Sequence, residues 1–379
     1  MNANINSNAR ATILDVSHLC VDYLSESGEV HAVSDVSLRL RRGEILGLAG
    51  ESGSGKSTMA YAITRLLRPP AEITRGEVLY YGRESDLSGS TTTAAPIDVL
   101  RLNPAELRAI RWSELAIVFQ SAMNALNPTM TVGSQLLDVL ATHRPEMPSA
   151  QRRERARELF ELVGIAAERL KSYPHELSGG MRQRATIAIA LALSPKIIIM
   201  DEPTTALDVV VQREILTELL RLREQLDLSI IFITHDLSLL LEIADTIAIM
   251  YAGRVVEMTS ARQLHHQPLH PYSFGMLHSF PSLHGERRLM TGIAGSPPDL
   301  RNVPTGCAFH PRCPLAFAPC STIVPDLLRS PAGQGGQSVA CHRYDPAHAA
   351  GMEPPTPTEM EEGYRALALA TSELGGTPA

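Results

Sequence analysis

A glycine-rich segment, G-x-x-x-x-G-K-S at residues 50–57, constrains this chain more than any other feature. It directly follows a short apolar run, Ile45–Ala49, and opens a helical pattern, Thr58–Leu67. Glycines at such a strand-to-helix turn let backbone N–H groups surround phosphate oxygens, and the helix N-terminus adds a favourable dipole. The segment therefore predicts a nucleotide phosphate site on an α/β scaffold.

The polar residues of this segment each have an expected contact. Lys56 should reach the β- and γ-phosphates, and the Ser57 hydroxyl should bind Mg²⁺. A plain glycine turn is the alternative, and three spaced glycines followed by Lys-Ser argue against it. The residues expected to bind nucleotide are Gly50, Ser52, Gly53, Ser54, Gly55, Lys56, Ser57 and Thr58.

A pair of carboxylates follows a second apolar run, Ile197–Met200. Asp201 suits the Mg²⁺ shell, and Glu202 suits polarisation of an attacking water. An ordinary strand end capped by acids is the alternative. Because the pair accompanies the glycine-rich segment, we predict nucleotide hydrolysis.

Short apolar runs alternate with helical patterns from Ala11 to Arg262, which predicts an α/β domain with a largely parallel central sheet. Period-two alternation in Ile13–Asp22 and Ala32–Leu40 predicts an antiparallel region beside it. The expected buried strands are Ile45–Ala49, Leu115–Phe119, Ile197–Met200 and Ile230–Thr234. The expected helices are Thr58–Leu67, Ala150–Val163, Gly180–Leu193, Gln212–Gln225 and Ser238–Asp245.

Composition excludes several classes of protein. The chain has 379 residues, 44% hydrophobic and 20% charged, which is typical of a globular protein. Its formal net charge of −7 argues against nucleic acid as a partner. No run reaches the roughly 20 apolar residues that span a bilayer, and the first residues lack the apolar core of a signal peptide. We therefore expect a cytoplasmic protein with reduced thiols.

The texture changes after Ala261, where Pro and Gly become frequent and four of the five cysteines occur. We predict three parts: a nucleotide-binding domain at residues 11–262, a small loop-rich domain at 263–345, and a flexible tail at 346–379 that ends in a short helical pattern, Tyr364–Glu373. Residues 86–96 are small and polar, and are expected to form a surface loop.

The segment Leu177–Arg184, LSGGMRQR, lies between the two nucleotide motifs. It resembles the signature motif of ABC-type ATPases, with Met181 where the family has Gln. The resemblance implies that Ser178, Gly179 and Gly180, at the start of a helix, face the nucleotide bound by a partner subunit.

Other segments match the same family. Gln120 resembles the glutamine of the Q-loop, which would contact Mg²⁺ and sense a transmembrane subunit. Residues Ala206–Asp208 resemble the D-loop, and His235 resembles the switch histidine that contacts the γ-phosphate. Tyr23 lies where the family stacks an aromatic ring on adenine, although it could be an ordinary strand residue.

The resemblance implies a P-loop NTPase fold of the ABC ATPase type. This fold combines a parallel central sheet, an antiparallel β subdomain and an α-helical subdomain, here followed by the small Cys-containing C-terminal domain. Further blocks narrow the resemblance to ATP-binding subunits of bacterial dipeptide/oligopeptide/nickel importers. These blocks are Phe119–Pro128, His270–Tyr272, Gly295–Leu300 and Gly306–Pro314.

A subunit of this kind binds ATP and Mg²⁺ and powers import of di- or oligopeptides from the cytoplasmic face of the inner membrane, as a peripheral protein. Its implied partners are two transmembrane permease subunits, a second homologous ATP-binding subunit and an extracytoplasmic solute-binding protein. Nickel, opine and haem-like cargo are alternatives. A non-transport ABC ATPase of DNA repair or translation is the rival class, and this chain lacks the coiled-coil inserts or tandem cassettes usual there.

The cysteines at the C-terminal side have the spacing C-x5-C-x6-C-x20-C. Neither a zinc ribbon nor a ferredoxin shows this spacing. A metal could replace the missing core of this segment, so iron–sulfur, zinc and free thiols all stay open, with His310 and His342 as further candidate ligands. The family resemblance implies a [4Fe–4S] cluster held by Cys307, Cys313, Cys320 and Cys341.

Overall fold

The computed structural model describes residues 10–25, 28–82, 95–120, 125–205, 207–279, 292–330, 336–349 and 351–374. The expected loop at 86–96 lies almost entirely outside these ranges. None of the helices in them is both long and apolar enough to span a lipid bilayer.

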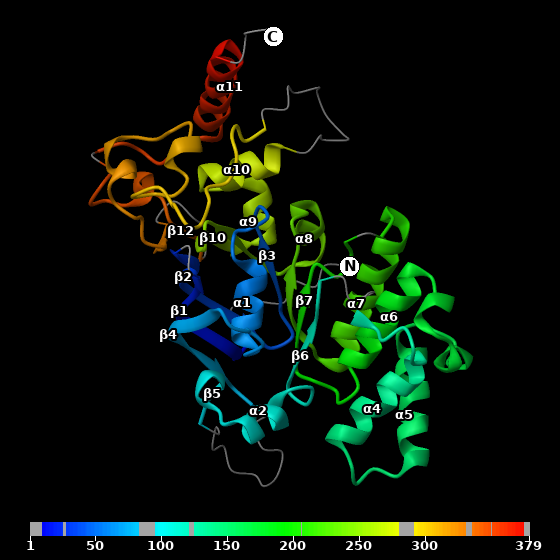
Figure 1. Ribbon diagram of the computed structural model, residues 1–379. Helices are drawn as coiled ribbons and strands as arrows, with labels where there is room; N and C mark the ends of the chain where they lie inside the picture. The colour runs from blue at the N-terminus through cyan, green and yellow to red at the C-terminus, as the bar shows by residue number, and fades with distance from the viewer. Residues whose placement is uncertain are drawn as a thin grey trace.

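The central feature is an eight-stranded sheet in the order β11-β12-β10-β9-β3-β8-β7-β6 (Figure 1). Its middle is parallel, because β3 pairs with β8 and β9, and β7 pairs with β6 and β8. Every residue of β3, β7 and β8 is buried, which is why they are continuous apolar runs. The four predicted strands are confirmed within a residue or so at each end. The strands are β3 (Ile45–Ala49), β6 (Leu115–Val118), β7 (Ile197–Asp201), β8 (Ser229–Ile233), β9 (Thr246–Tyr251) and β10 (Arg254–Ser260).

A second, antiparallel sheet has the order β2-β1-β4-β5, which confirms the antiparallel region. Its strands are β1 (Thr12–Ser25), β2 (Gly28–Arg41), β4 (Ala71–Tyr80) and β5 (Ile97–Asp98). Inward residues such as Leu14 and Val16 share one apolar core with Met59 of helix α1 (Lys56–Ile63) and Leu46 of β3. Helix α1 is thus held against both sheets, which fixes the glycine-rich turn at its start.

A second core covers the other face of the central sheet, and α4, α5 and α6 stand together at one side of it (Figure 1). This group forms the expected helical part. Besides α1, the α-helices before β9 are α2 (Pro104–Ile110), α4 (Val132–His143), α5 (Ser149–Leu162), α6 (Gly179–Ala190), α7 (Val209–Leu226) and α8 (Leu237–Ile243). Short 3₁₀ turns are η2 (Val99–Arg101), η3 (Ala167–Lys171) and η4 (Pro174–Glu176).

The region after β10 has short elements, yet it is joined to the central sheet. Strand β12 (Ser338–Val339) pairs with β10 and β11 (Leu328–Arg329), and Phe309 lies in the second core. The sequence did not predict this pairing, because two-residue strands leave no periodic pattern. The other elements are α9 (Ala261–His266), α10 (Pro271–His278), η5 (His310–Arg312), η6 (Ala318–Ser321) and η7 (His342–Tyr344).

The tail is helical where the short pattern predicted a helix, but it packs against the rest of the fold instead of being flexible. Residues Pro357–Leu374 form helix α11, and Met360 and Tyr364 are 1% and 2% exposed. The Tyr364 hydroxyl donates to the carbonyl of Pro271 at 2.8 Å, and its ring stacks on Phe274 of α10. A flexible tail is therefore the wrong description of this stretch. Two apolar residues four positions apart fill a gap beside α10, and that partner could not be seen in the local sequence.

Candidate nucleotide site

The glycine-rich turn between β3 and α1 has a backbone that only glycine tolerates at two positions. Gly50 has φ +150°, and a Cβ there would lie 2.2 Å from the carbonyl oxygen of Met250. Gly55 has φ +97°, and its Cβ would lie 2.2 Å from the carbonyl oxygen of Ala32. The loop is therefore pressed between β9 and β2, with its backbone N–H groups gathered at the start of α1.

Lys56 is nearly buried inside this loop. Its Nζ donates to the carbonyl oxygens of Gly50 at 2.7 Å and Glu51 at 2.9 Å, and to Ser54 Oγ at 3.3 Å. Burial lowers the pKa of the Lys56 ammonium, while the carboxylates of Glu202 and Asp201 act in the opposite direction. The positive charge is thus fixed where phosphate oxygens would meet it.

Ser57 and Asp201 come together across α1 and β7. Ser57 Oγ donates to Asp201 Oδ1 at 2.9 Å. Asp201 is 0% exposed, and the Tyr61 hydroxyl interacts with its carboxyl group, although Oδ2 meets no donor in full hydrogen-bonding geometry among the described residues. Burial raises the pKa of Asp201. A hydroxyl beside an unsatisfied carboxylate oxygen suits Mg²⁺, which prefers hard oxygen ligands, so the residues fit this ion.

The other predicted catalytic groups, Gln120 and His235, both contact the Glu202 carboxylate. Gln120 Nε2 and Thr205 Oγ1 both donate to Glu202 Oε2 at 3.0 Å, and His235 Nδ1 lies 3.4 Å from Oε1. Glu202 has φ +46°, a left-handed backbone that is costly for a residue with a side chain and is frequent at functional sites. In the described chain, the amide of Gln120 binds Glu202 rather than Ser57 or Asp201.

Tyr23 lies at the edge of the same site. Its hydroxyl is 3.3 Å from Thr58 Oγ1, and the side chain is half-buried. Tyr23 therefore lies beside the start of α1. Its contact with adenine stays a prediction. Thr205 is a contact of Glu202 that sequence reasoning did not select, because a lone Thr after a strand carries no motif.

The segment Ser178–Gly180 begins α6. Ser178 is exposed, and its Oγ accepts from Met181 N at 3.2 Å as the helix cap. No hydrogen bond in the described ranges joins this segment to the glycine-rich loop of the same chain. Nearby, Val209 and Val210 at the start of α7 are 77% and 69% exposed. Of the D-loop segment, Ala206 lies outside the described residues.

Three residues that sequence analysis did not select tie the glycine-rich loop to the C-terminal region. The Glu51 N–H donates to the Tyr272 hydroxyl at 2.9 Å. The Arg312 guanidinium binds both Glu51 carboxylate oxygens, at 2.7 and 3.1 Å. The Arg312 side chain is only 7% exposed. The blocks His270–Tyr272 and Gly306–Pro314 contain these partners and were the available signal.

Arg312 is held from several sides. Its guanidinium also donates to the carbonyl oxygens of Ala294 and Gly295, at 2.9 and 3.2 Å, and lies 5.8 Å from the centre of the Tyr251 ring. A bidentate, largely desolvated pair of this kind fixes geometry as well as charge. The glycine-rich loop is thus braced by the segment that precedes Cys313.

The four predicted cysteine ligands surround one small cavity, together with Phe309 and Leu315. No three of their Sγ atoms lie within 4.8 Å of one another, although the thiols influence each other electrostatically. Burial raises the pKa of Cys307 to about 11 and that of Cys341 to about 12, and raises the pKa of Cys313 as well. The structure thus brings all four cysteines to one place.

A groove of about 400 Å³ lies beside Gln120. Its walls include Trp112, Phe119, Leu126 and Val139, and the Phe119 ring is 39% exposed. An apolar groove of this size on the protein surface is typical of a place where another chain docks.

Comparison with known proteins agrees with this geometry. Residues 33–205 match the ABC transporter family, and residues 256–320 match the family described as oligopeptide/dipeptide transporter, C-terminal region. The oligopeptide transport ATP-binding protein OppD of Salmonella typhimurium is 42% identical over 87% of this chain and 93% of its own length. The dipeptide transport ATP-binding protein DppD of Bacillus subtilis is 42% identical over 83% of this chain and 90% of its own.

Solved structures give the same class. The dimeric ATP-binding cassette MJ0796, in a post-hydrolysis state with ADP and phosphate, has a TM-score of 0.56 and 29% identity. It covers 66% of this chain and 99% of its own. Cassette CbiO1 of Clostridium perfringens has a TM-score of 0.55 and 28% identity, covering 68% of this chain and 92% of its own.

The fold and the site therefore define an ABC-type ATPase. Within that class, the chain belongs to the family of oligopeptide and dipeptide transport ATP-binding proteins.

Proposed function

We propose that this chain binds and hydrolyses ATP to power import of di- or oligopeptides through a multi-subunit transporter. The observation that carries the proposal is the convergence of Ser57, Asp201 and Glu202 at the carboxyl ends of parallel strands, beside a buried Lys56. Ligands of open parallel sheets bind at this edge. The relatives, which transport oligopeptides and dipeptides, supply the cargo class.

Each residue has a role in this proposal. The loop N–H groups and Lys56 bind the phosphates, and Ser57 and Asp201 hold Mg²⁺, which neutralises charge on the β- and γ-phosphate oxygens. Glu202 orients and polarises the attacking water. His235 and Gln120 hold the Glu202 carboxylate in place, so both are also placed to respond to the γ-phosphate.

The active unit is a pair of ATP-binding subunits. Ser178 is exposed and makes no hydrogen bond to the glycine-rich loop of its own chain among the described residues, and Val209 and Val210 at the start of α7 present apolar surface. A second, homologous subunit would cover that surface and supply its own Ser-Gly-Gly turn to the first nucleotide. The dimeric arrangement of MJ0796 is consistent with this pairing.

The remaining partners follow from transport. Two permease subunits would span the membrane, with a helical segment of each docked in a groove such as the one lined by Trp112 and Phe119. An extracytoplasmic solute-binding protein would deliver the peptide. The chain itself would act as a peripheral protein on the cytoplasmic face of the inner membrane.

We also propose a [4Fe–4S] cluster at Cys307, Cys313, Cys320 and Cys341. Thiolates around one Zn²⁺ ion lie about 3.8 Å apart for a Zn–S bond of about 2.3 Å. No three of the Sγ atoms lie within 4.8 Å of one another, so the thiols would have to move closer together to bind a single Zn²⁺ ion. Burial disfavours free thiolates here, so the charge of a metal is needed to stabilise them.

The transport proposal is tested in proteoliposomes that contain this chain, its partner ATPase and the permeases. Peptide uptake should require internal ATP and the binding protein. Ser178→Arg should abolish uptake and turnover while ATP still binds, because a bulky cation blocks closure of the pair. Full turnover by the isolated chain would refute the composite site.

The cluster is tested by metal analysis of anaerobically purified protein. About four irons per chain and a brown colour are expected. Any of the four Cys→Ser changes should remove the iron, whereas Cys20→Ser should not. Protein that contains zinc without iron, or neither metal, would contradict the cluster.

A further inference from the structure

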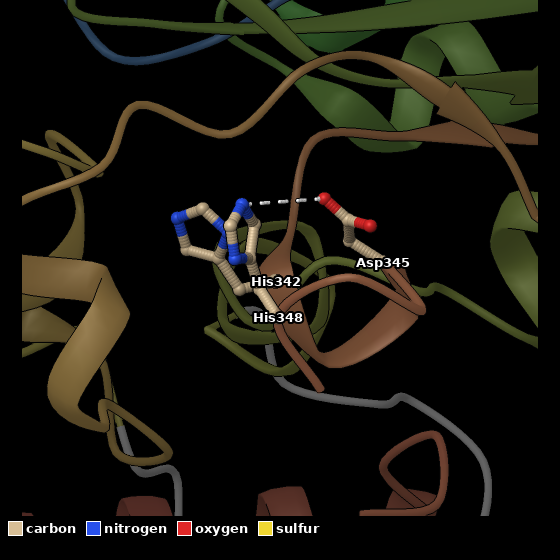
Figure 2. Close-up of side chains that lie close together, drawn as sticks. All are labelled: His342, Asp345 and His348. Atoms are coloured by element: carbon tan, nitrogen blue, oxygen red, sulfur yellow. Dashed lines mark ion pairs between the residues drawn. The ribbon is translucent and has the colours of Figure 1, made fainter. Parts of the chain in front are cut away.

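A second cluster of metal-ligating side chains lies just after the last cysteine. His342, Asp345 and His348 each offer one ligand atom, and these three atoms lie within 4.8 Å of one another. Figure 2 shows the two imidazole rings side by side, with the Asp345 carboxylate opposite His348. The ring centres are 5.1 Å apart, and Asp345 Oδ2 is 3.9 Å from His348 Nε2.

The turn that follows β12 makes this arrangement. Asp345 N donates to the carbonyl oxygen of His342 at 3.2 Å, and His348 N donates to that of Asp345 at 3.0 Å. Successive turns of three residues place the three side chains on the same side of the chain. Asp345 Oδ1 accepts from Ala347 N at 2.9 Å, which fixes the carboxylate.

The state of His342 distinguishes this cluster from an ordinary surface group. Its side chain is 1% exposed, and its Nε2–H donates to the carbonyl of Ile323 at 2.8 Å. This contact leaves a lone pair on Nδ1, which is buried and has no hydrogen-bond partner in the described chain. A buried polar atom without a hydrogen-bond partner destabilises the fold. A carbonyl that orients one ring nitrogen while the other is free is the arrangement found behind metal-binding histidines.

We propose that His342 Nδ1, an Asp345 carboxylate oxygen and His348 Nε2 form a site for a divalent transition-metal cation of the zinc class. Two imidazoles and one carboxylate match the ligand preference of Zn²⁺ and of Co²⁺ as its substitute. Ligand atoms around a tetrahedral Zn²⁺ lie about 3.4 Å apart, so small rotations of the two partly exposed side chains close the site.

Neighbouring charge does not oppose a cation here. The guanidinium of Arg343 is directed to Glu359, with contacts of 2.9 and 3.3 Å, so its charge is balanced. The site is separate in chemistry from the cysteines, because it has nitrogen and oxygen ligands. A bound ion would fasten the turn at 342–348, through His342, to the backbone at Ile323.

Another group of candidate ligands, in the antiparallel sheet, serves as the comparison. It consists of Asp22, Glu29 and His31. There the ring nitrogen of His31 already bonds Asp22 Oδ1 at 2.7 Å, and Thr74 donates to Asp22 Oδ2. Asp22 and His31 satisfy each other, so they do not require an ion. His31→Ala is therefore the matched control.

The test uses the full chain, first stripped with a chelator and then titrated with Co²⁺ under anaerobic conditions. His348→Ala and Asp345→Asn are the variants, because both side chains are partly exposed and the fold should survive. We expect one Co²⁺ with weak d–d absorption and none of the intense charge-transfer absorption that thiolates produce. Both variants should weaken this binding at least tenfold, and His31→Ala and His310→Ala should not.

Zn²⁺ provides a second readout. It should raise the thermal unfolding temperature of the parent chain and of His31→Ala, with little effect on His348→Ala. The proposal would be overturned if Co²⁺ did not bind, or if it bound only with the intense absorption of thiolate ligands. So would equal affinity in the parent chain and both variants, or loss of the ion in His31→Ala alone.

Discussion

The nucleotide loop and the cysteine-rich region of this protein are stabilised in different ways. Strands β3, β7 and β8 are fully buried and contribute to two apolar cores, one on each face of the central sheet. In the described residues from 292 to 349, large buried apolar side chains are few, and Phe309 and Tyr344 stand out among them. Polar contacts to distant backbone groups stabilise this region instead. Buried strands and helices can be predicted from sequence because they show periodic or continuous apolar patterns. Polar contacts between residues far apart in the chain leave no such pattern.

The two regions are nevertheless joined. Arg312 and Tyr272 both hydrogen-bond to Glu51, so residues of the C-terminal region fix the loop that would bind the phosphates. Mutations on either side of this contact can show whether the regions act independently.

The largest effect is expected at Glu202, within the nucleotide region. Glu202→Gln keeps the shape and removes the charge that polarises water. ATP should still bind, and steady-state turnover of the assembled transporter should fall about a hundredfold or more. Glu214→Gln, which removes an exposed charge near Arg184, is the control. Turnover near that of the parent would exclude Glu202 as the group that activates water.

Arg312→Met tests the contact between the regions. It leaves the Glu51 carboxylate without its partner and removes the donors to Ala294 and Gly295. Breaking a buried pair costs about 3–5 kcal/mol, which urea unfolding measures. ATP should also bind more weakly, because Glu51 belongs to the phosphate loop.

The matched control is Arg301→Met, whose pair with Asp299 is on the surface and is screened by solvent, so its loss should change stability little. Adding Glu51→Gln to Arg312→Met should restore part of the stability, since no unpaired charge remains. If Arg312→Met behaves like Arg301→Met, the two regions are independent.

How far the sequence could lead is clear from particular residues. The run Ile45–Ala49 and the acids after Ile197–Met200 lie where the patterns predicted them, because their strands are buried on both faces. The pairing of β12 with β10, and the burial of Met360 and Tyr364, depend on partners distant in the chain. The contact of Arg312 with Glu51 could not be predicted either, because both residues lie in recognisable blocks but nothing in the sequence pairs one block with the other.

Glu257 of β10 lies at the junction of the regions and gives a pH test. It is fully buried, accepts from the backbone N–H groups of Leu269 and His270, and burial raises its pKa to about 7 from 4.5. The folded state thus favours the protonated form. Its contribution to stability is complete below pH 4.5 and is lost as pH rises to 7, by about 3 kcal/mol.

Glu257→Gln cannot titrate, so the difference in unfolding free energy between parent and variant should change by this amount across pH 4.5–7. The exposed Glu242→Gln is the control for removing a surface carboxyl. A flat difference for Glu257→Gln would mean that this carboxyl is hydrated in solution.

The smallest effect concerns α11, where the tail joins the C-terminal region. Tyr364→Phe keeps the ring against Phe274 and removes the hydrogen bond to the carbonyl of Pro271. A lost hydrogen bond of this kind costs about 1 kcal/mol of unfolding free energy. Tyr173→Phe, at a side chain 40% exposed, should cost almost nothing. Amide hydrogen exchange then locates the change: faster exchange in α11 and α10, with α1 unaffected, is expected if the helix packs as observed. Equal and rapid exchange of α11 in the parent and the variant would instead show that the helix is detached in solution.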